Sequence, residues 1–322
     1  MKLSVCIPVY KVEAYIERCA RSLFEQTYQD IEYIFVDDCS PDDSIGVVQR
    51  LVAADESLKS RVKFIANKKG EGALVSRQKA LASSTGELVT FLDSDDWVDL
   101  DLYEKMVAKF TDREVGMVFA PMVRNENGPM RGVQDLDFVG TGLKYLDNCR
   151  RVVAFSSMVN KVYRRELALK AMEGLPPGLK IAEDRTFITQ LALSCLKVRS
   201  VTHSAYHYRV NETSVSNQLD GRRILDDLTR EYEFSSSILP PEKALNLRKM
   251  LLTDLIFLGM KFGELSQAKA RDYLIELHRI NGLADLRELD LPRRVVIGLT
   301  SWSYLLAKLF CAILRLKGSS GL

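Results

Sequence analysis

The chain has no excess charge of one sign, no paired cysteines and no signal-peptide segment. Lys and Arg together number 45 against 43 Asp and Glu in 322 residues, so no nucleic-acid partner is expected. None of the six cysteines lies in a C-x-x-C pair. This argues against a zinc site or a disulfide framework and favours free thiols in a reducing compartment. The N-terminus enters a strand pattern directly, so we expect the main body to stay in the cytoplasm.

The usual phosphate-binding motifs are also absent. The sequence contains no G-x-x-x-x-G-K-[ST] loop. Gly70-Glu71-Gly72 begins like a dinucleotide fingerprint, but Val75 stands where the third glycine should be. Without a glycine-rich cradle, a metal ion is the expected way for this chain to hold phosphates.

Apolar periodicity predicts strands that alternate with helices. Residues Ile16, Ala20, Leu23 and Phe24 have helical spacing, and Leu74–Ala82 forms a second predicted helix. The predicted strands are Lys2–Val9, Ile31–Val36, Val62–Ile65 and Leu88–Leu92. This order is typical of an α/β protein with a doubly wound, mostly parallel, Rossmann-like sheet.

The stretch Leu88–Trp97 is the most informative part of the sequence. Its apolar start has no alternation, which indicates a strand buried on both faces, and acidic residues follow directly. Side chains two apart on an extended chain point the same way, so Asp93 and Asp95 can face one ligand. Such carboxylates suit Mn²⁺ or Mg²⁺ bound together with a diphosphate. The alternative is an acidic turn in which Asp96 or Asp99 caps a following helix.

Other polar residues follow the neighbouring predicted strands. Tyr10 comes after the first strand, and Asp37 and Asp38 come after the second. Right-handed crossovers place all these strand ends on one edge of a parallel sheet, where ligands bind in open α/β folds. The convergence of acidic groups from separate strands favours a binding site over a solvated turn.

These residues resemble the family 2 inverting glycosyltransferases, which have the GT-A fold. The resemblance covers roughly residues 2–215 and is carried by Ser4–Tyr10, Gln26–Tyr28, Val36–Asp42, Arg77, Gly86–Trp97, Asn160–Glu166 and Glu183-Asp184. Cys39 stands where the family motif usually has glycine, which we expect to affect loop shape more than chemistry.

The resemblance implies a nucleotide-diphosphate sugar donor, UDP-linked, and assigns residues to it. Tyr10 would stack on the base, and Asp38, or less directly Asp37, would accept the imide N–H of uracil. Asp95 would ligate the metal directly, and Asp93 would contact the metal, its bound water or the ribose. The remaining residues that the resemblance implies for the donor site are Pro8, Val9, Glu13, Arg77 and Ser94.

The resemblance also implies a general base on a later segment. Asp184 is expected to take the proton of the acceptor hydroxyl, with Glu183 as a substitute. The alternative is that both are acidic residues in a first helical turn that complement the helix dipole. Lys161, His207 and Arg209 are weaker candidates for contacts with phosphate, metal or acceptor, and a histidine between tyrosines is more often structural.

The expected organisation is a donor-binding half (1–100), an acceptor-binding half (101–220), a helical extension (221–290) and an amphipathic tail (291–322). Within the tail, Val295–Ala307 is uncharged but shorter than the about 20 residues that span a bilayer. Polar residues recur every seven positions, at Arg294, Ser301, Lys308 and Arg315. This predicts a helix on the inner face of the membrane. The alternative is packing on the domain or on a second subunit, as in a homodimer.

The sequence therefore predicts a metal-dependent inverting glycosyltransferase that acts on a glycan or lipid-linked acceptor in surface polysaccharide or glycolipid synthesis. Two other hypotheses remain. The carboxylates Asp93 and Asp95 could serve a phosphatase of the haloacid dehalogenase type, although that leaves Asp38 and Asp184 unused. The chain could also be a non-catalytic, membrane-bound scaffold that binds nucleotide.

Overall fold

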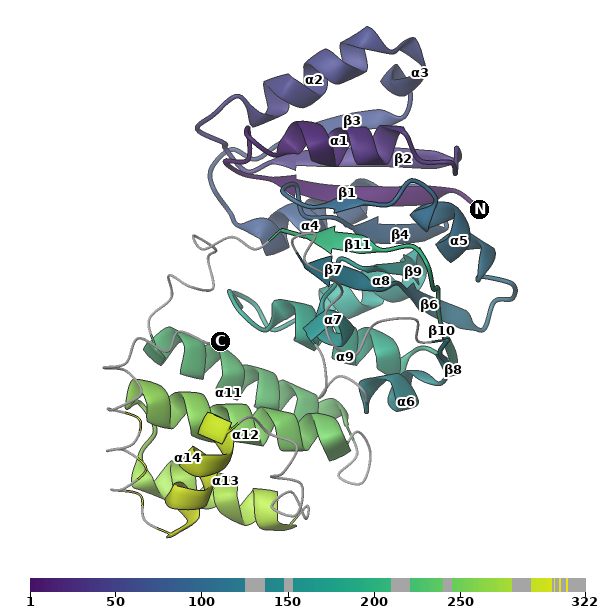
Figure 1. Ribbon diagram of the computed structural model, residues 1–322. Helices are drawn as coiled ribbons and strands as arrows, with labels where there is room; N and C mark the ends of the chain where they lie inside the picture. Colours follow the sequence, from purple (N-terminus) through teal and green to yellow (C-terminus); the bar gives the residue numbers. More distant parts are fainter. Residues whose placement is uncertain are drawn as a thin grey trace. The chain divides into compact units, whose positions relative to one another are not determined.

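The computed structural model describes residues 1–124, 137–147, 153–209, 221–239, 245–279 and 291–302, together with 304, 307 and 311. The chain forms two compact units (Figure 1). The α/β unit consists of Met1–Leu175 and Glu183–Asn211, and the helical unit consists of Pro176–Ala182 and Glu212–Leu322.

A mixed, mostly parallel sheet forms the centre of the α/β unit. Its spatial order is β3-β2-β1-β4-β9-β6-β10-β8. The strands are β1 (Leu3–Val9), β2 (Ile31–Asp37), β3 (Val62–Ala66), β4 (Leu88–Phe91), β6 (Val115–Phe119), β8 (Val139–Gly140), β9 (Lys161–Arg164) and β10 (Lys197–Ser200). Strands β1 to β4 pair in parallel, whereas β9 is antiparallel to both of its neighbours. The predicted fold class is confirmed.

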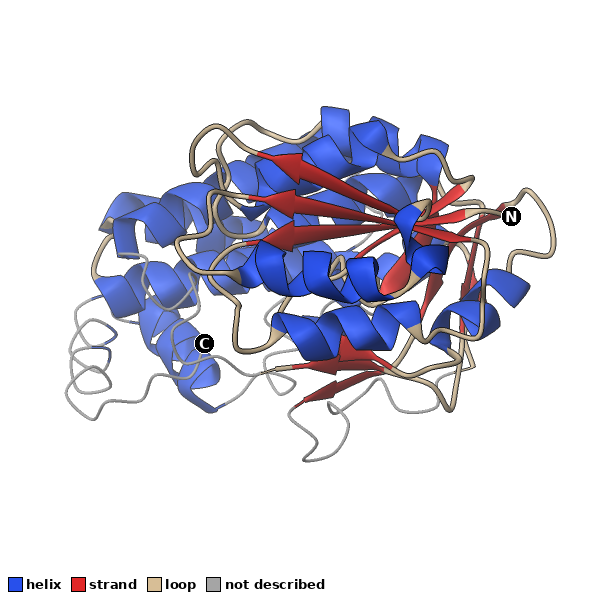
Figure 2. Ribbon diagram, turned by 90° about the horizontal axis from the view of Figure 1, so that it is seen from above, coloured by secondary structure: helices blue, strands red, loops and turns tan. Residues whose placement is uncertain are grey.

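Helices lie on both sides of the strands (Figure 2). They are α1 (Ile16–Phe24), α2 (Ser44–Ala54), α3 (Glu56–Lys59), α4 (Ala73–Ser83), α5 (Leu102–Ala108), α6 (Gly142–Leu146), α7 (Val153–Ser156), α8 (Arg165–Glu173) and α9 (Glu183–Leu193). A second small sheet has the order β5-β11-β7, formed by Trp97–Val98, Tyr206–Tyr208 and Met122–Arg124.

Aromatic packing fixes α9 against the centre of the large sheet. Phe91 on β4 meets Phe187 on α9 edge to face at 5.8 Å, and Tyr163 on β9 meets the same ring at 5.5 Å. All three side chains are fully buried. Burial of one such side chain contributes about 1.5–3 kcal/mol, so the start of α9 is held next to the end of β4.

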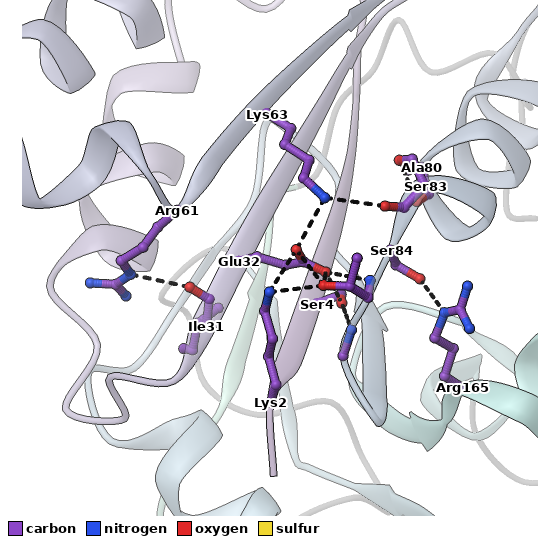
Figure 3. Close-up of polar contacts among 12 residues, drawn as sticks. Lys2, Ser4, Ile31, Glu32, Arg61, Lys63, Ala80, Ser83, Ser84 and Arg165 are labelled. Carbon is purple, nitrogen blue, oxygen red and sulfur yellow. Dashed lines mark hydrogen bonds and ion pairs between the residues drawn. The ribbon is translucent and has the colours of Figure 1, made fainter.

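A buried carboxylate joins the segments at the N-terminal ends of β1, β2 and β4 (Figure 3). Glu32 on β2 accepts hydrogen bonds from Ser4 Oγ at 2.6 Å and Thr85 N at 2.6 Å, and its side chain is 4% exposed. The ammonium groups of Lys2 and Lys63 lie at 3.0 and 3.3 Å. Burial alone would raise the pKa of Glu32, but these hydrogen bonds outweigh burial and lower the pKa to about 2.

The helical unit contains α11 (Gly221–Ile238), α12 (Leu245–Phe262), α13 (Gln267–Arg279) and α14 (Leu291–Trp302). Along one face of α12, Leu247, Leu251, Leu255 and Leu258 are buried, and Phe262 at its end is half-buried.

The described part of the tail contributes to the core of the helical unit. Val296, Ile297, Ala307 and Cys311 are buried there. Within the described parts of the chain, no helix is long and apolar enough to cross a bilayer. Trp302 ends α14, but its side chain is not described, and the other residues expected to face a membrane lie outside the described residues: Leu305, Leu306, Leu309, Phe310, Ile313 and Leu314. Membrane binding therefore stays a prediction.

Candidate active site

Three adjacent parallel strands end together at one edge of the large sheet. Val9 pairs with Asp37, and the Asp38 amide donates to the Val9 carbonyl at 2.9 Å. On the other side of β1, the Leu92 amide donates to Cys6 O at 3.1 Å, and Asp93 follows. The structure thus brings together the polar residues that follow β1, β2 and β4.

The residues expected to line the base differ in exposure. Pro8 and Val9 are buried in β1. The next side chain, Tyr10, is 56% exposed at the strand end, which leaves its ring free to stack on a planar ligand. Asp37 Oδ1 accepts a hydrogen bond from Ser40 N at 2.9 Å. Asp37 therefore shapes the turn after β2.

Asp38 anchors the loop between β3 and α4. Its carboxylate accepts hydrogen bonds from Asn67 Nδ2 at 2.6 Å and from the backbone amides of Glu71 and Gly72, each at 2.8 Å. Gly72 has φ +89°, which favours glycine at this position. A carboxylate has about four acceptor positions, so one further donor, such as an imide N–H, can still bind.

Glu13 joins the loops after β1 and β2. Its carboxylate accepts a hydrogen bond from Asp43 N at 3.0 Å, and its own amide donates to Asp42 Oδ2 at 3.1 Å. Glu13 thus fixes these two loops to each other through their backbone amides.

Arg77 connects Asp93, the first aspartate of the Asp93-x-Asp95 (D-x-D) pair, to the candidate base Asp184. Its Nη2 lies 2.6 Å from Asp93 Oδ1, and its Nη1 lies 3.7 Å from Asp184 Oδ1 and 4.0 Å from Glu183 Oε1. The Arg77 residue is only 5% exposed. Burial disfavours the charged guanidinium, but Asp93, Asp184 and Glu183 outweigh burial and raise the pKa of Arg77. One buried cation therefore holds three acidic groups from two segments in register.

Asp184 lies in the first turn of α9, as the sequence predicts. Its Oδ2 accepts hydrogen bonds from Met158 N at 3.1 Å and Ser157 Oγ at 3.3 Å. Its side chain is 32% exposed, whereas that of Glu183 is 19% exposed. Burial and the neighbouring Asp184 raise the pKa of Glu183 to about 7, opposed by Arg77. Asp184 is therefore the more accessible carboxylate.

Asp95, the second member of the D-x-D pair, is matched with Arg209. Arg209 Nη2 lies 3.0 Å from Asp95 Oδ2, and its guanidinium stacks over the Tyr15 ring at 3.6 Å. Burial and Asp93 raise the pKa of Asp95, and Arg209 opposes them. Burial and Asp93 thus disfavour the ionised form of Asp95 despite Arg209, and a divalent cation would favour it.

The alternative interpretation, in which Asp96 or Asp99 caps a following helix, is wrong. The chain after Asp96 forms strand β5, and the next helix begins at Leu102. Asp96 accepts hydrogen bonds from Tyr206 Oη and from Arg209 N, and Asp99 accepts one from Ala205 N at 2.8 Å. The acidic run therefore binds β11 rather than a helix N-terminus.

The remaining candidates have partners within the protein. His207 Nε2 lies 2.7 Å from Asp99 Oδ1, and its ring stacks on Trp97 at 5.1 Å. Lys161 is fully buried, with Nζ at 2.6 Å from Asn160 Oδ1. Ser94 is 5% exposed. In this arrangement His207 and Lys161 act as structural groups.

Asp93 and Asp95 would offer a metal ion few protein ligands. The described residues contain no group of three or more His, Cys, Asp or Glu side chains arranged to hold a metal. Asp93 and Asp95 nevertheless fit Mn²⁺ or Mg²⁺, because these ions take few carboxylates and complete their shell with phosphate oxygens and water.

Several contacts of the site carry no local sequence signal. Tyr15 stacks on Arg209, and the Met158 amide holds Asp184. Both contacts join residues far apart in the chain. Met158 lies two residues before Asn160, where the family motif begins, so the sequence pattern alone does not point to Met158.

Comparison with known proteins assigns the family. The model of Glycosyl transferase family 2 matches residues 4–170, which is more than half of the chain. The protein belongs to this family. This assignment removes the phosphatase hypothesis, which also needs a free Asp93 rather than one paired with Arg77.

The relatives are bacterial glycosyltransferases. The chain is 25% identical to glycosyltransferase GlyA of Streptococcus pneumoniae over 94% of this chain and 44% of GlyA. It is 31% identical to the poly(ribitol-phosphate) beta-N-acetylglucosaminyltransferase TarS of Staphylococcus aureus over 65% of this chain and 35% of TarS. It is 27% identical to the putative glycosyltransferase EpsH of Bacillus subtilis over 79% and 74%. The chain thus spans less than half of GlyA and TarS.

Solved structures share the fold. Residues 1–349 of S. aureus TarS in complex with UDP-GlcNAc superpose with a TM-score of 0.67 at 19% identity, covering 99% of this chain and 92% of that one. The mannosyltransferase PcManGT of Pyrobaculum calidifontis, in complex with GDP-Man and Mn²⁺, gives 0.58 at 18% identity, covering 99% and 88%. These likenesses establish the GT-A architecture.

Proposed function

We propose that this protein is a metal-dependent, inverting glycosyltransferase with a UDP-sugar donor. The observation that carries the proposal is the Arg77 bridge. It joins Asp93, on the donor side, to Asp184, on a separate segment, through ion pairs at 2.6 and 3.7 Å. The UDP-GlcNAc named with the TarS structure supports the choice of donor.

Each group of the site has a part in a single displacement. An acceptor hydroxyl attacks the anomeric carbon and its proton passes to an Asp184 carboxylate oxygen, while the bond from that carbon to the diphosphate oxygen breaks and UDP leaves. Arg77 and the Met158 amide orient the Asp184 carboxylate. A cation held by Asp93 and Asp95 would supply charge stabilisation for the leaving diphosphate.

The donor base would lie at the ends of β1 and β2. Tyr10 offers an exposed ring for stacking, and the remaining acceptor position of Asp38 suits an imide N–H. A base without that donor would leave a partly buried carboxylate position unpaired, which selects for uracil.

We further propose an acceptor of surface polysaccharide or glycolipid synthesis, glycan or lipid-linked, reached at the inner face of the membrane through the tail helix. The name of TarS, a poly(ribitol-phosphate) beta-N-acetylglucosaminyltransferase, supports a polymer acceptor. The test is sedimentation of the full chain with anionic vesicles. Replacing Lys308 and Arg315 by Glu should lower the bound fraction, and unchanged binding would contradict an electrostatic role of the tail.

The proposed reaction is tested by incubating the native chain with UDP-sugars and Mn²⁺ and measuring UDP release. Proton NMR of the product then gives the anomeric configuration. Release of UDP with an inverted linkage supports the proposal. Retention of configuration, or UDP binding without turnover for every donor and acceptor tried, would favour a different mechanism or a nucleotide-binding scaffold.

A further inference from the structure

The segment that leads into the candidate base belongs to the helical unit. Pro176–Ala182 lies between α8 and α9 in the sequence, yet it folds with α11 to α14. Ile181 and Ala182 pack against the apolar core of that unit. The next two residues are Glu183 and Asp184, in the first turn of α9. The helical unit therefore holds the chain up to the residue that precedes α9.

One face of α11 binds the backbone of this segment through side-chain hydrogen bonds. Asp227 is fully buried, and its Oδ2 accepts hydrogen bonds from Lys180 N at 2.9 Å and Ile181 N at 3.2 Å. Arg223 donates to the Gly178 carbonyl, and Arg230 donates to the Pro177 carbonyl. Three side chains of one helix thus satisfy four backbone groups in a segment without regular secondary structure.

The same three side chains also form ion pairs with one another. Arg223 Nη2 lies 3.2 Å from Asp227 Oδ1, and Arg230 Nη1 lies 3.8 Å from it. Their spacings of four and three residues place them on one face of α11. A buried carboxylate is costly without such partners. The arrangement therefore resists rearrangement, and we call Arg223, Asp227 and Arg230 the α11 clamp.

Backbone geometry at the end of the segment requires anchoring on both sides. Ala182 has φ +64°, a left-handed conformation that costs a residue with a Cβ about 1–2 kcal/mol. On the N-terminal side the anchor is the α11 clamp. On the C-terminal side it is Asp184, which accepts the Met158 amide and pairs with Arg77.

We propose that Asp227 is a positioning residue, which acts through the chain to set the start of α9 and thereby the place of the Asp184 carboxylate. A displacement of about 1 Å at a catalytic group can cost about a hundredfold in rate. The kinetic part of the inference rests on the proposed function, whereas the structural part does not.

The structural test is amide hydrogen exchange, resolved to single residues, on the full chain. We expect Asp227→Ala to speed exchange of the Lys180 and Ile181 amides and, at a distance, of the Met158 amide that Asp184 accepts, each by about tenfold or more. The matched control is Glu276→Ala. It removes the Arg248 ion pair at 3.1 Å within the helical unit and leaves Pro176–Ala182 untouched.

Faster exchange of the Lys180 and Ile181 amides with an unchanged exchange rate of the Met158 amide would overturn the inference. Asp184 would then be positioned without the α11 clamp. Equal effects of Asp227→Ala and Glu276→Ala would also overturn it. If Asp227→Ala does not fold, Arg230→Met takes its place. This change releases the Pro177 carbonyl and removes the longer ion pair with Asp227, and it should move the same amides in the same direction.

The kinetic test separates positioning from folding. We expect Asp227→Ala to lower kcat for UDP release by about tenfold or more, with UDP affinity in Mn²⁺ unchanged within about twofold. Asp227→Asn keeps an oxygen for both amides but loses the ion pairs with Arg223 and Arg230, so its kcat should lie between those of Asp227→Ala and the native chain. Unchanged kcat in Asp227→Ala would overturn the inference. Absence of UDP binding by the native chain would instead refute the proposed function and leave the exchange test valid.

Discussion

Glu183 carries a carboxyl group whose ionisation the folded α/β unit opposes. Its side chain is 19% exposed and lies beside Asp184, with the Arg77 guanidinium at 4.0 Å. Burial and Asp184 raise its pKa from 4.5 to about 7. Glu183→Gln keeps the shape of the side chain and removes the charge. We therefore expect this variant to be more stable than the native chain above neutral pH.

The sign and size follow from proton linkage. Between pH 4.5 and 7 the folded state binds the Glu183 proton more tightly than the unfolded state, so stability falls as pH rises through this range. The pKa difference corresponds to about 3 kcal/mol above pH 7 and to less than about 1 kcal/mol at pH 5. For a unit of about 200 residues, 3 kcal/mol is about 6–12 °C in the unfolding midpoint.

The assay is thermal unfolding of native chain and variant at pH 5 and pH 8.5. The variant should unfold at a higher temperature at pH 8.5 and at nearly the same temperature at pH 5. Glu173→Gln, at an exposed position at the end of α8, is the matched control and should change neither value. An equal shift at both pH values, or destabilisation at pH 8.5, would refute the reasoning.

Three further predictions concern single charges. Asp184→Asn should lower UDP release from a UDP-sugar by about 10²–10⁴-fold without changing UDP affinity; a loss under tenfold would place the base elsewhere. Arg77→Met leaves Asp93 and Asp184 without their buried cation and should lower the free energy of unfolding, measured in urea, by about 3–5 kcal/mol. An unchanged free energy of unfolding would contradict the Arg77 bridge. Glu32 has a pKa of about 2 against an ordinary 4.5, so its contribution of about 2–3 kcal/mol is complete above pH 4.5 and disappears towards pH 2. Glu32→Gln should lower stability at pH 7 and flatten acid unfolding over that range, and an unchanged acid profile would contradict this.

Local sequence pattern was sufficient for strands β1 to β4 and the candidate site at their ends. Leu88–Phe91 lacks alternation because both of its faces are buried, and such runs are recognisable in the sequence. The parallel order of β2, β1 and β4 then places Asp38 and Asp93 at neighbouring strand ends. These inferences succeeded because they depend only on strand direction and chain continuity.

The sequence could not reveal pairings between distant segments. In the alternative interpretation Asp96 or Asp99 capped the following helix, but β5 intervenes, because Trp97 and Val98 pair with His207 and Tyr206, more than 100 positions later. The partner of Asp95 is likewise distant, at Arg209. Nothing in the local pattern distinguishes a carboxylate that caps a helix from one that binds a remote strand.

Assignment of Pro176–Ala182 to the helical unit is equally non-local. The Pro176-Pro177-Gly178 sequence predicts only a loop. Its attachment comes from Asp227, which lies on a charged helix and has no sequence feature that marks it as buried. A buried charge in a helix becomes visible only when the backbone groups that it satisfies are known.

The most direct test of the donor site is calorimetric titration of the native chain and of Asp95→Asn with UDP, each with and without Mn²⁺. The account predicts that the native chain binds UDP tightly only with Mn²⁺. It also predicts that Asp95→Asn loses this metal-dependent gain while its thermal stability without ligand stays close to native. UDP affinity that ignores both Mn²⁺ and Asp95 would contradict the assignment of Asp93 and Asp95 as the metal–diphosphate site.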